Sequence, residues 1–344
     1  MAATSQMQAE SQEAPSVVAR MLEANRDRCK ALVQRLKKTR PPFAVTCARG
    51  SSDNAGTYAK YLLEIRLRLV TASVGPSISS VYGVAPEMKG AFLLAISQSG
   101  RSPDLLSLAE AGRKGGALTV AMVNDTDSPL GKAAEVMLPL LAGPERSVAA
   151  TKSYIASLGA ILQLVAHWAG DAEMLDAVAR LPEQLDRAAR LDWSEAEGML
   201  RNARSLFVVG RGPGFGVAQE AALKLKEICG MHAEALSSAE LMHGPLALPG
   251  VDFPVLAFLQ ADATETGMVK VLRSLSGRGV PVAAAGSEDQ SAGTVLLPSV
   301  PGAHPFVAPI LLIQSFYLLA ERLAWARGRD PDRPPHLKKV TETR

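Results

Sequence analysis

The chain has 344 residues, 47% of them hydrophobic and 21% charged, which is enough for two modest soluble domains with a sizeable core. A net charge of +3 gives no electrostatic reason to expect a nucleic acid or an anionic membrane as partner. Only 5% of the residues are aromatic, which argues against a carbohydrate-binding surface built from stacked rings.

The N-terminal region and the cysteines indicate the compartment. Residues 1–16 contain acidic residues and no apolar core, so they do not form a signal peptide, and we expect a disordered leader. Cys29, Cys47 and Cys229 are far apart and form no CxxC pair, so neither a disulfide framework nor a zinc site is indicated. Three unpaired cysteines fit a reducing compartment, and we expect a cytoplasmic protein.

Short, continuously apolar runs recur along the chain, with helical stretches such as 55–72 and 217–229 between them. Continuous apolar runs are typical of strands covered on both faces, and their alternation with helices predicts an α/β fold with open parallel sheets. The predicted strands are 43–47, 91–96, 118–123, 136–141, 206–209, 254–259, 280–285 and 294–297.

The two sets of strands indicate a duplication. FAVTCARGSSDNAG, from residue 43, and LFVVGRGPGFGVA, from residue 206, each read as a strand, a loop of small residues and a helix. We therefore predict one lobe at 17–170, beginning with a helix at about 17–38, and a second lobe at 202–344. The charged segment 171–201 has a helical pattern and no strand signal, so it is assigned as a helical linker.

An uncharged stretch at 299–320 is long enough to raise the question of a membrane span. Pro301, Gly302, Pro305 and Pro309 interrupt it. A buried C-terminal helix that begins near Pro305 is therefore the favoured interpretation.

Two loops of the first lobe have the composition of a phosphate cradle. Gly50-Ser51-Ser52 follows one predicted strand, and the serine-rich segment 97–102 follows the next. Helix starts supply unpaired N–H groups, and the loops of an open α/β sheet lie where ligands bind. Helix caps and tight turns explain any single such loop, but two in one lobe favour phosphate binding.

The corresponding loop of the second lobe, residues 210–216, is glycine-rich. Phe215 stands where the third glycine of a dinucleotide-binding GxGxxG motif would fall, and the chain has no Walker motif. Nucleotide binding is therefore disfavoured.

Polar residues of the second lobe suit proton-transfer chemistry. Glu220, Lys224 and Glu227 share one face of a predicted helix, which either is a solvated, salt-bridged face or carries function. His243 follows Glu240 on a short helical turn that ends before Gly-Pro, where it either projects into a cleft or is structural. Aldose–ketose interconversion needs a ring-opening acid or base, a carboxylate that moves a proton between C1 and C2, and often a lysine.

These residues lie in stretches that resemble the sugar isomerase (SIS) domain family. The resemblance is closest to the isomerase half of glucosamine-6-phosphate synthases and to stand-alone SIS-type glucosamine-6-phosphate deaminases. It covers nearly the whole chain, in the family's order, and implies two tandem SIS lobes of Rossmann- or flavodoxin-like type. The matching stretches are GSSDNAG (50–56), ISQSGRSPD (96–104), ERSVAATKSY (145–154), EAALKLKEICGMHAEALSSAELMHGPLAL (220–248) and HLKKVTET (336–343).

The resemblance also implies roles for individual residues. Glu227 would transfer the proton, with help from Lys224, and His243 would open the sugar ring, in the site of a neighbouring subunit of a homodimer. Lys339 would lie over the substrate carbonyl, and Glu145 would contact the sugar. The phosphate and nearby sugar oxygens would be held by Gly50, Ser51, Ser52, Ser97, Gln98, Ser99 and Ser102.

Three departures from the family pattern bear on the activity. Residue 2 is Ala where a glutaminase domain would begin with a catalytic cysteine, so we expect no glutamine hydrolysis. Arg49 replaces a small residue or cysteine before Gly50, and Arg101 replaces an acidic residue in the serine loop. Both arginines add positive charge near the expected phosphate or sugar, and they leave the substrate open.

The resulting hypothesis is conversion of glucosamine 6-phosphate and water to fructose 6-phosphate and ammonia. Proton transfers suffice for this reaction, so no metal or redox cofactor is expected. One alternative is a fructosamine-6-phosphate deglycase or another amino-sugar-phosphate isomerase. Another is a non-catalytic phosphosugar sensor, which would need the serine loops but not Glu227, His243 and Lys339 together.

Overall fold

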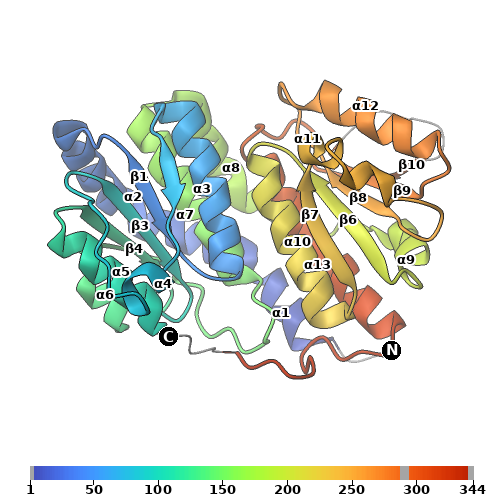
Figure 1. Cartoon of the computed structure of the whole chain (residues 1–344), viewed down its shortest axis with the longest axis horizontal. Helices are drawn as coiled ribbons and strands as arrows, with labels where there is room; N and C mark the ends of the chain where they lie inside the picture. The colour runs from blue at the N-terminus through green and yellow to red at the C-terminus, as the bar shows by residue number, and fades with distance from the viewer. Residues whose placement is uncertain (1–3, 287–293, 340–344) are drawn as a thin grey trace. The chain divides into compact units, whose positions relative to one another are not determined.

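The computed structural model describes residues 4–286 and 294–339, which fall into two compact units (Figure 1). The first unit is built from residues 14–145 and 152–182, with the tail that starts at Lys338. The second unit is built from residues 183–337, with residues 146–151 and the N-terminal residues up to Glu13.

The first unit contains a five-stranded parallel sheet with the order β2-β1-β3-β4-β5. Every residue of β1, β3 and β4 is buried, because helices cover both faces of the sheet (Figure 1). The strands are β1 (Ala44–Cys47), β2 (Thr71–Ser73), β3 (Phe92–Ser97), β4 (Leu118–Val123) and β5 (Val136–Pro139). The helices are α2 (Ala14–Thr39), α3 (Ser51–Leu67), α4 (Ser77–Ser80), α5 (Pro103–Lys114), α6 (Pro129–Ala133) and α7 (Lys152–Ala169), and α8 (Ala172–Ala188) runs across the boundary between the units.

The second unit repeats this plan with the sheet order β7-β6-β8-β9-β10, again all parallel. Its strands are β6 (Ser205–Gly210), β7 (His232–Ser237), β8 (Val255–Phe258), β9 (Val282–Ala285) and β10 (Thr294–Leu297). Its helices are α1 (Gln6–Gln12), α9 (Ser194–Leu200), α10 (Pro213–Cys229), α11 (Ser238–Leu241), α12 (Glu265–Ser276) and α13 (Ala308–Ala326), with a 3₁₀ turn at Pro245–Ala247.

The duplication extends to the loops. Helices α3 and α10 each have 17 residues, and each starts after a glycine with a positive φ, 55° at Gly50 and 58° at Gly212. A left-handed φ favours glycine, which explains why glycine occurs at both positions, each time after an arginine. The predicted α/β fold with two parallel sheets is confirmed, and all eight predicted strands are present.

The structure differs from the sequence-based expectation at the N-terminus and in two strands. The leader is helical, and Glu10 is buried, where its carboxylate accepts N–H groups of Arg146 and Ser147. This order comes from tertiary contacts that composition does not show. The missed strands β2 and β7 are too short or too polar to stand out as apolar runs.

Within the described residues, no helix is long and apolar enough to cross a membrane. Helix α13 contains the apolar stretch that raised this question, and most of its residues are buried in the second unit. The prediction of a buried C-terminal helix is therefore confirmed.

The turn from β6 into α10 depends on a close backbone approach, which gives a prediction. A Cβ at Gly210 would lie 2.5 Å from the carbonyl oxygen of Gly214. We expect Gly210→Ala to lower the free energy of unfolding by about 1–3 kcal/mol or more, because backbone has to move. Gly198→Ala, in α9, would meet no atom within 4 Å and is expected to be neutral or stabilising by up to about 1 kcal/mol.

Thermal and urea unfolding of the two variants measures the difference. Equal stabilities for the two variants would contradict this account of the turn.

Candidate active site

The two serine loops meet at the carboxyl edge of the first sheet. Strands β1 and β3 are adjacent, with Cys47 opposite Ala95, and the chain leaves them in loops that start α3 and α5. This is the topological switch point of the sheet, where open α/β folds bind ligands. Gly50 and Ser102 are the N-cap residues of the two helices. The N-terminal ends of two helices, with their N–H groups, therefore lie at the same edge.

The hydroxyl groups of these loops fall into two classes. Those of Ser97 and Ser99 accept backbone N–H groups of the loop itself, from Gly100 at 3.0 Å and Arg101 at 3.3 Å. The side chains of three further residues make no hydrogen bond within the part of the chain that the structure describes: Ser52, Ser102 and Gln98. The first class shapes the loop, and the second class is available to a ligand.

Glu145 and the tail lysine are brought together in the first unit. The Glu145 carboxylate is buried and accepts hydrogen bonds from the Ser153 backbone N–H at 3.1 Å and from the Ser153 hydroxyl at 2.6 Å. It also lies 3.1 Å from the Lys339 Nζ, 194 positions away in sequence. The sequence had suggested separate roles for these two residues. Residues 340–343 of the tail motif lie outside the described residues.

Helix α10 carries a buried cation between two carboxylates. Lys224 Nζ lies 3.3 Å from Glu220 Oε1 and 2.5 Å from Glu227 Oε2. The side chains of Lys224 and Glu220 are 1% and 0% exposed, so this is not a solvated face, whereas Glu227 is 21% exposed. Burial acts to lower the pKa of Lys224, but the two carboxylates outweigh it and the pKa is raised. The lysine therefore stays protonated, and Glu227 is its solvent-reaching partner.

His243 lies in the turn after α11. Its ring is exposed, its backbone N–H donates to Glu240 O, and its ring makes no hydrogen bond to the described residues. The structure thus does not bring His243 to Glu227 or Lys224 through a hydrogen bond.

In the second unit, a glutamine side chain occupies the place that corresponds to the serine loops of the first unit. Gln260 follows β8 as Gln98 follows β3, but its Nε2 donates to Arg211 O at 2.8 Å. Its Oε1 lies 2.5 Å from where a Cβ of Gly214 would be. Leu259 and Ala261 stand at the positions of Ser97 and Ser99. The amide of Gln260 is therefore engaged within its own unit, whereas the Gln98 side chain makes no hydrogen bond to the described residues.

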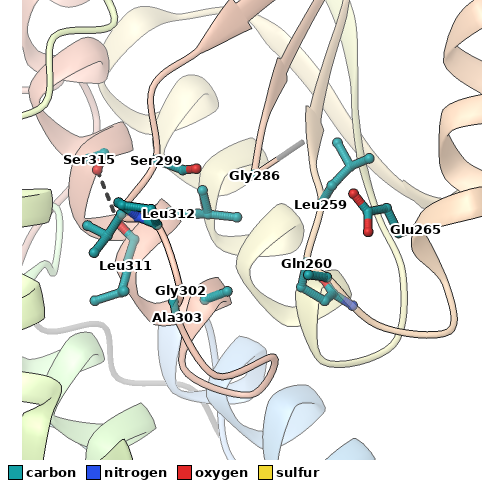
Figure 2. A pocket seen from close by; sticks show the side chains of 14 residues that line it. Leu259, Gln260, Glu265, Gly286, Ser299, Gly302, Ala303, Leu311, Leu312 and Ser315 are labelled. Carbon is teal, nitrogen blue, oxygen red and sulfur yellow. Dashed lines mark hydrogen bonds between the residues drawn. The ribbon is translucent and has the colours of Figure 1, made fainter. Parts of the chain in front are cut away.

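A separate cavity of about 310 Å³ lies at the ends of β8, β9 and β10. Figure 2 shows Gln260 and Glu265 on one side and Leu311, Leu312 and Ser315 on the other. Among the residues that the structure describes, no cationic side chain lines it, and none of the sequence-predicted site residues does. It is therefore not the predicted phosphate site.

The three cysteines are free and buried, and burial raises the pKa of each to about 12. They are therefore unreactive as thiolates near neutral pH. The described residues include no group of three metal-ligating side chains.

Comparison with known proteins places this architecture in a family. The SIS domain model matches residues 44–167, which contain all five strands of the first sheet, and residues 199–292, which contain β6 to β9 of the second. The chain belongs to the SIS domain family. It is 35% identical over 343 residues to the glutamine–fructose-6-phosphate aminotransferase (isomerizing) of Thermotoga maritima, covering 90% of this chain and 55% of that protein. The chain thus spans about half the length of the curated relatives it matches.

Solved structures of SIS proteins share the whole fold. A proposed phosphosugar isomerase from Silicibacter pomeroyi DSS-3 is 40% identical with a TM-score of 0.90, over 96% of this chain and 100% of that one. The C-terminal domain of the Francisella tularensis glucosamine-fructose-6-phosphate aminotransferase is 25% identical with a TM-score of 0.87, over 97% and 99% of the two chains. A Thermotoga maritima glucosamine-6-phosphate deaminase, 21% identical with a TM-score of 0.77 over 98% and 100%, shares the fold.

Sequence reasoning gave no site role to two buried acids. Glu220 was noted for its i, i+4 spacing to Lys224, but that spacing also occurs on solvated faces. Asp104 is fully buried at the second position of α5, where it pairs with Arg49 and accepts the Leu105 N–H. An alternation of polar and apolar residues cannot identify either, because each is buried by contacts outside its own helix turn.

Proposed function

We propose that this chain is a phosphosugar isomerase of the deaminating kind, which converts glucosamine 6-phosphate and water to fructose 6-phosphate and ammonia. The observation that carries the proposal is the partly exposed Glu227 carboxylate, held 2.5 Å from a fully buried lysine. A carboxylate with a fixed cation behind it can take a proton and return it without changing position. The names of the SIS relatives, two fructose-6-phosphate aminotransferases and a phosphosugar isomerase, support the substrate class.

In this proposal the first unit binds the phosphate. The donors for phosphoryl oxygens are the helix-start N–H groups, the amide of Gln98 and the hydroxyls of Ser52 and Ser102, which make no hydrogen bond to the described residues. Gly50 and Ser51 shape the start of α3 beside them. Neutral donors bind a dianion without the cost of burying a lysine.

The chemistry follows as proton transfers. His243 would open the ring by moving a proton from the C1 hydroxyl to the ring oxygen. Glu227 would take the C2 proton of the open chain and return it to C1, which leaves a C2 imine. Water adds to this imine, and ammonia leaves as the C2 carbonyl forms. Lys224 would stabilise the Glu227 carboxylate, and Lys339, held by Glu145, would polarise the substrate carbonyl.

We also propose that the protein is a homodimer and that His243 acts in the partner's site. This fits a histidine that is exposed and forms no ring hydrogen bond among the described residues. Light scattering measures the mass in solution, and a monomer at assay concentration would overturn this part of the proposal.

The activity itself can be tested directly. Purified protein should release ammonia from glucosamine 6-phosphate, with fructose 6-phosphate formed in equal amount. Turnover on a fructosamine 6-phosphate or a galactosamine phosphate alone would move the assignment to a deglycase or another isomerase. Tight binding of one phosphosugar without any turnover would replace the enzyme with a sensor.

A further inference from the structure

Arg49 lies at the junction of the two serine loops. It follows β1 and precedes Gly50, the N-cap of α3. Its Nε donates to Asp104 Oδ2 at 2.9 Å, and Asp104 is the second residue of α5. The ion pair therefore joins the loop after β1 to the helix after β3, across 55 positions of sequence.

The pair is asymmetric. The Asp104 side chain is 1% exposed and that of Arg49 is 49% exposed. The contact uses Nε, and the guanidinium makes no other hydrogen bond to the described residues. Both Nη groups thus remain as donors, in the fork geometry that matches phosphate oxygens.

The acidic neighbours of Arg49 do not cancel this role. The Asp104 carboxylate is also stabilised by the Leu105 N–H, at 2.8 Å, and by the positive end of α5. Asp53, in the first turn of α3, is nearby, and burial raises its pKa while Arg49 acts to lower it. The carboxylates reduce the net charge, but recognition by Arg49 would depend on directed N–H groups fixed by a buried partner.

Two other arginines show what is particular to Arg49. Arg101, also a departure from the family pattern, uses Nη2 to bind Asp125, in a pair whose side chains are 57% and 37% exposed. Exposed pairs of this kind contribute little. Arg211 precedes Gly212 as Arg49 precedes Gly50, but Thr266 occupies the position of Asp104. The buried carboxylate partner thus occurs at the serine cradle and not at its filled counterpart.

We propose that Arg49 is a phosphate-binding residue of the first unit, oriented by Asp104, whose two Nη groups donate to phosphoryl oxygens of the sugar phosphate. The inference rests on the proposed function, because it takes the serine loops as the phosphate site. Removal of the phosphate group from the sugar would then lower the binding affinity more than it would if the serines were the only phosphate donors.

The test is calorimetric binding of glucosamine 6-phosphate, glucosamine and inorganic phosphate to wild type, Arg49→Gln and the matched control Arg101→Gln. Loss of a charged hydrogen-bonding partner predicts that Arg49→Gln weakens glucosamine 6-phosphate binding about 10- to 100-fold. Arg101→Gln should change it less than about threefold. In turnover, Arg49→Gln should raise KM and leave kcat within about threefold.

The outcomes separate the two hypotheses. Wild type that binds neither phosphosugar nor inorganic phosphate would overturn the phosphate cradle and this inference together. Wild type that binds, with Arg49→Gln binding equally well, overturns the inference and leaves the proposed function intact. An equal loss of affinity for glucosamine and for glucosamine 6-phosphate in Arg49→Gln also overturns the inference. It would indicate that Arg49 stabilises the fold of the loops and does not contact the phosphate.

A second variant covers the case in which Arg49→Gln does not fold. Arg49→Lys keeps the positive charge but lacks the fork, and it should still lose at least about fivefold in glucosamine 6-phosphate affinity. Wild-type affinity in Arg49→Lys would overturn the bidentate contact.

Discussion

Glu227→Gln is expected to reduce kcat for ammonia release by about 10²- to 10⁴-fold, the usual contribution of a positioned general acid or base. The amide is nearly isosteric and can still accept a hydrogen bond from Lys224, which lies 2.5 Å from the native carboxylate. The helix should therefore keep its structure, and the lost property is the ability to carry a proton. Steady-state assays with glucosamine 6-phosphate measure kcat, and calorimetry measures binding.

The control for this variant is Glu234→Gln, on β7, where the side chain is exposed and forms no described ion pair. It should leave kcat within about twofold, as expected for a surface substitution. Glu227→Gln should bind glucosamine 6-phosphate within about threefold of wild type, because the substitution removes none of the proposed phosphate donors. A loss of kcat smaller than about tenfold would remove Glu227 from the proton-transfer role.

Lys224→Met is expected to lower the free energy of unfolding by about 3–5 kcal/mol, because it leaves the buried Glu220 carboxylate without its cation. Glu220→Leu combined with Lys224→Met should recover most of this loss, since a buried ion pair can be replaced by apolar groups at little cost. Lys226→Met, on the exposed face of the same helix, should cost less than about 0.5 kcal/mol. Thermal unfolding, with far-ultraviolet circular dichroism as a check on folding, compares the three variants.

The pH dependence of this stabilisation follows from the raised pKa of Lys224, for which the ordinary value is 10.5. A pKa that is higher in the folded than in the unfolded state stabilises the fold at all pH values below the unfolded one. The stability difference between wild type and Lys224→Met should therefore be constant near neutral pH and narrow as the pH rises beyond about 10.5. Similar stability of the two proteins at pH 7 would contradict the buried ion pair.

The fold was largely predictable from local patterns. Continuous apolar runs identified eight strands, and the two stretches from residues 43 and 206, each a strand, a loop of small residues and a helix, identified the duplication. These features are local because a strand buried on both faces must be apolar at every position. Strands β2 and β7 escaped detection because edge strands need less apolar surface, and β2 and β7 are the edges on one side of each sheet.

The candidate site was predictable only as a set of residue types. The sequence placed Lys224 and Glu227 on one helical face but left open whether that face is solvated, because i, i+3 and i, i+4 pairs occur in both environments. The burial of Lys224 and Glu220 settles that point in favour of a buried ion pair. The helical order of residues 6–12 was likewise invisible, since it depends on Glu10 reaching a segment 136 positions away.

The sequence alone therefore determined the architecture, the duplication and the chemical types available to the site. Only the tertiary structure showed that Arg49, and not Arg101, has a buried carboxylate partner. It also showed that the glycine loop of the second unit accepts a hydrogen bond from a glutamine side chain. Arg49 is distinguished from Arg101 by a carboxylate 55 positions away, and Gln260 fills one cradle by bonding to a loop 49 positions away. Periodicity reports the face on which a side chain lies, whereas its partner is set by contacts between segments that only the folded chain brings together.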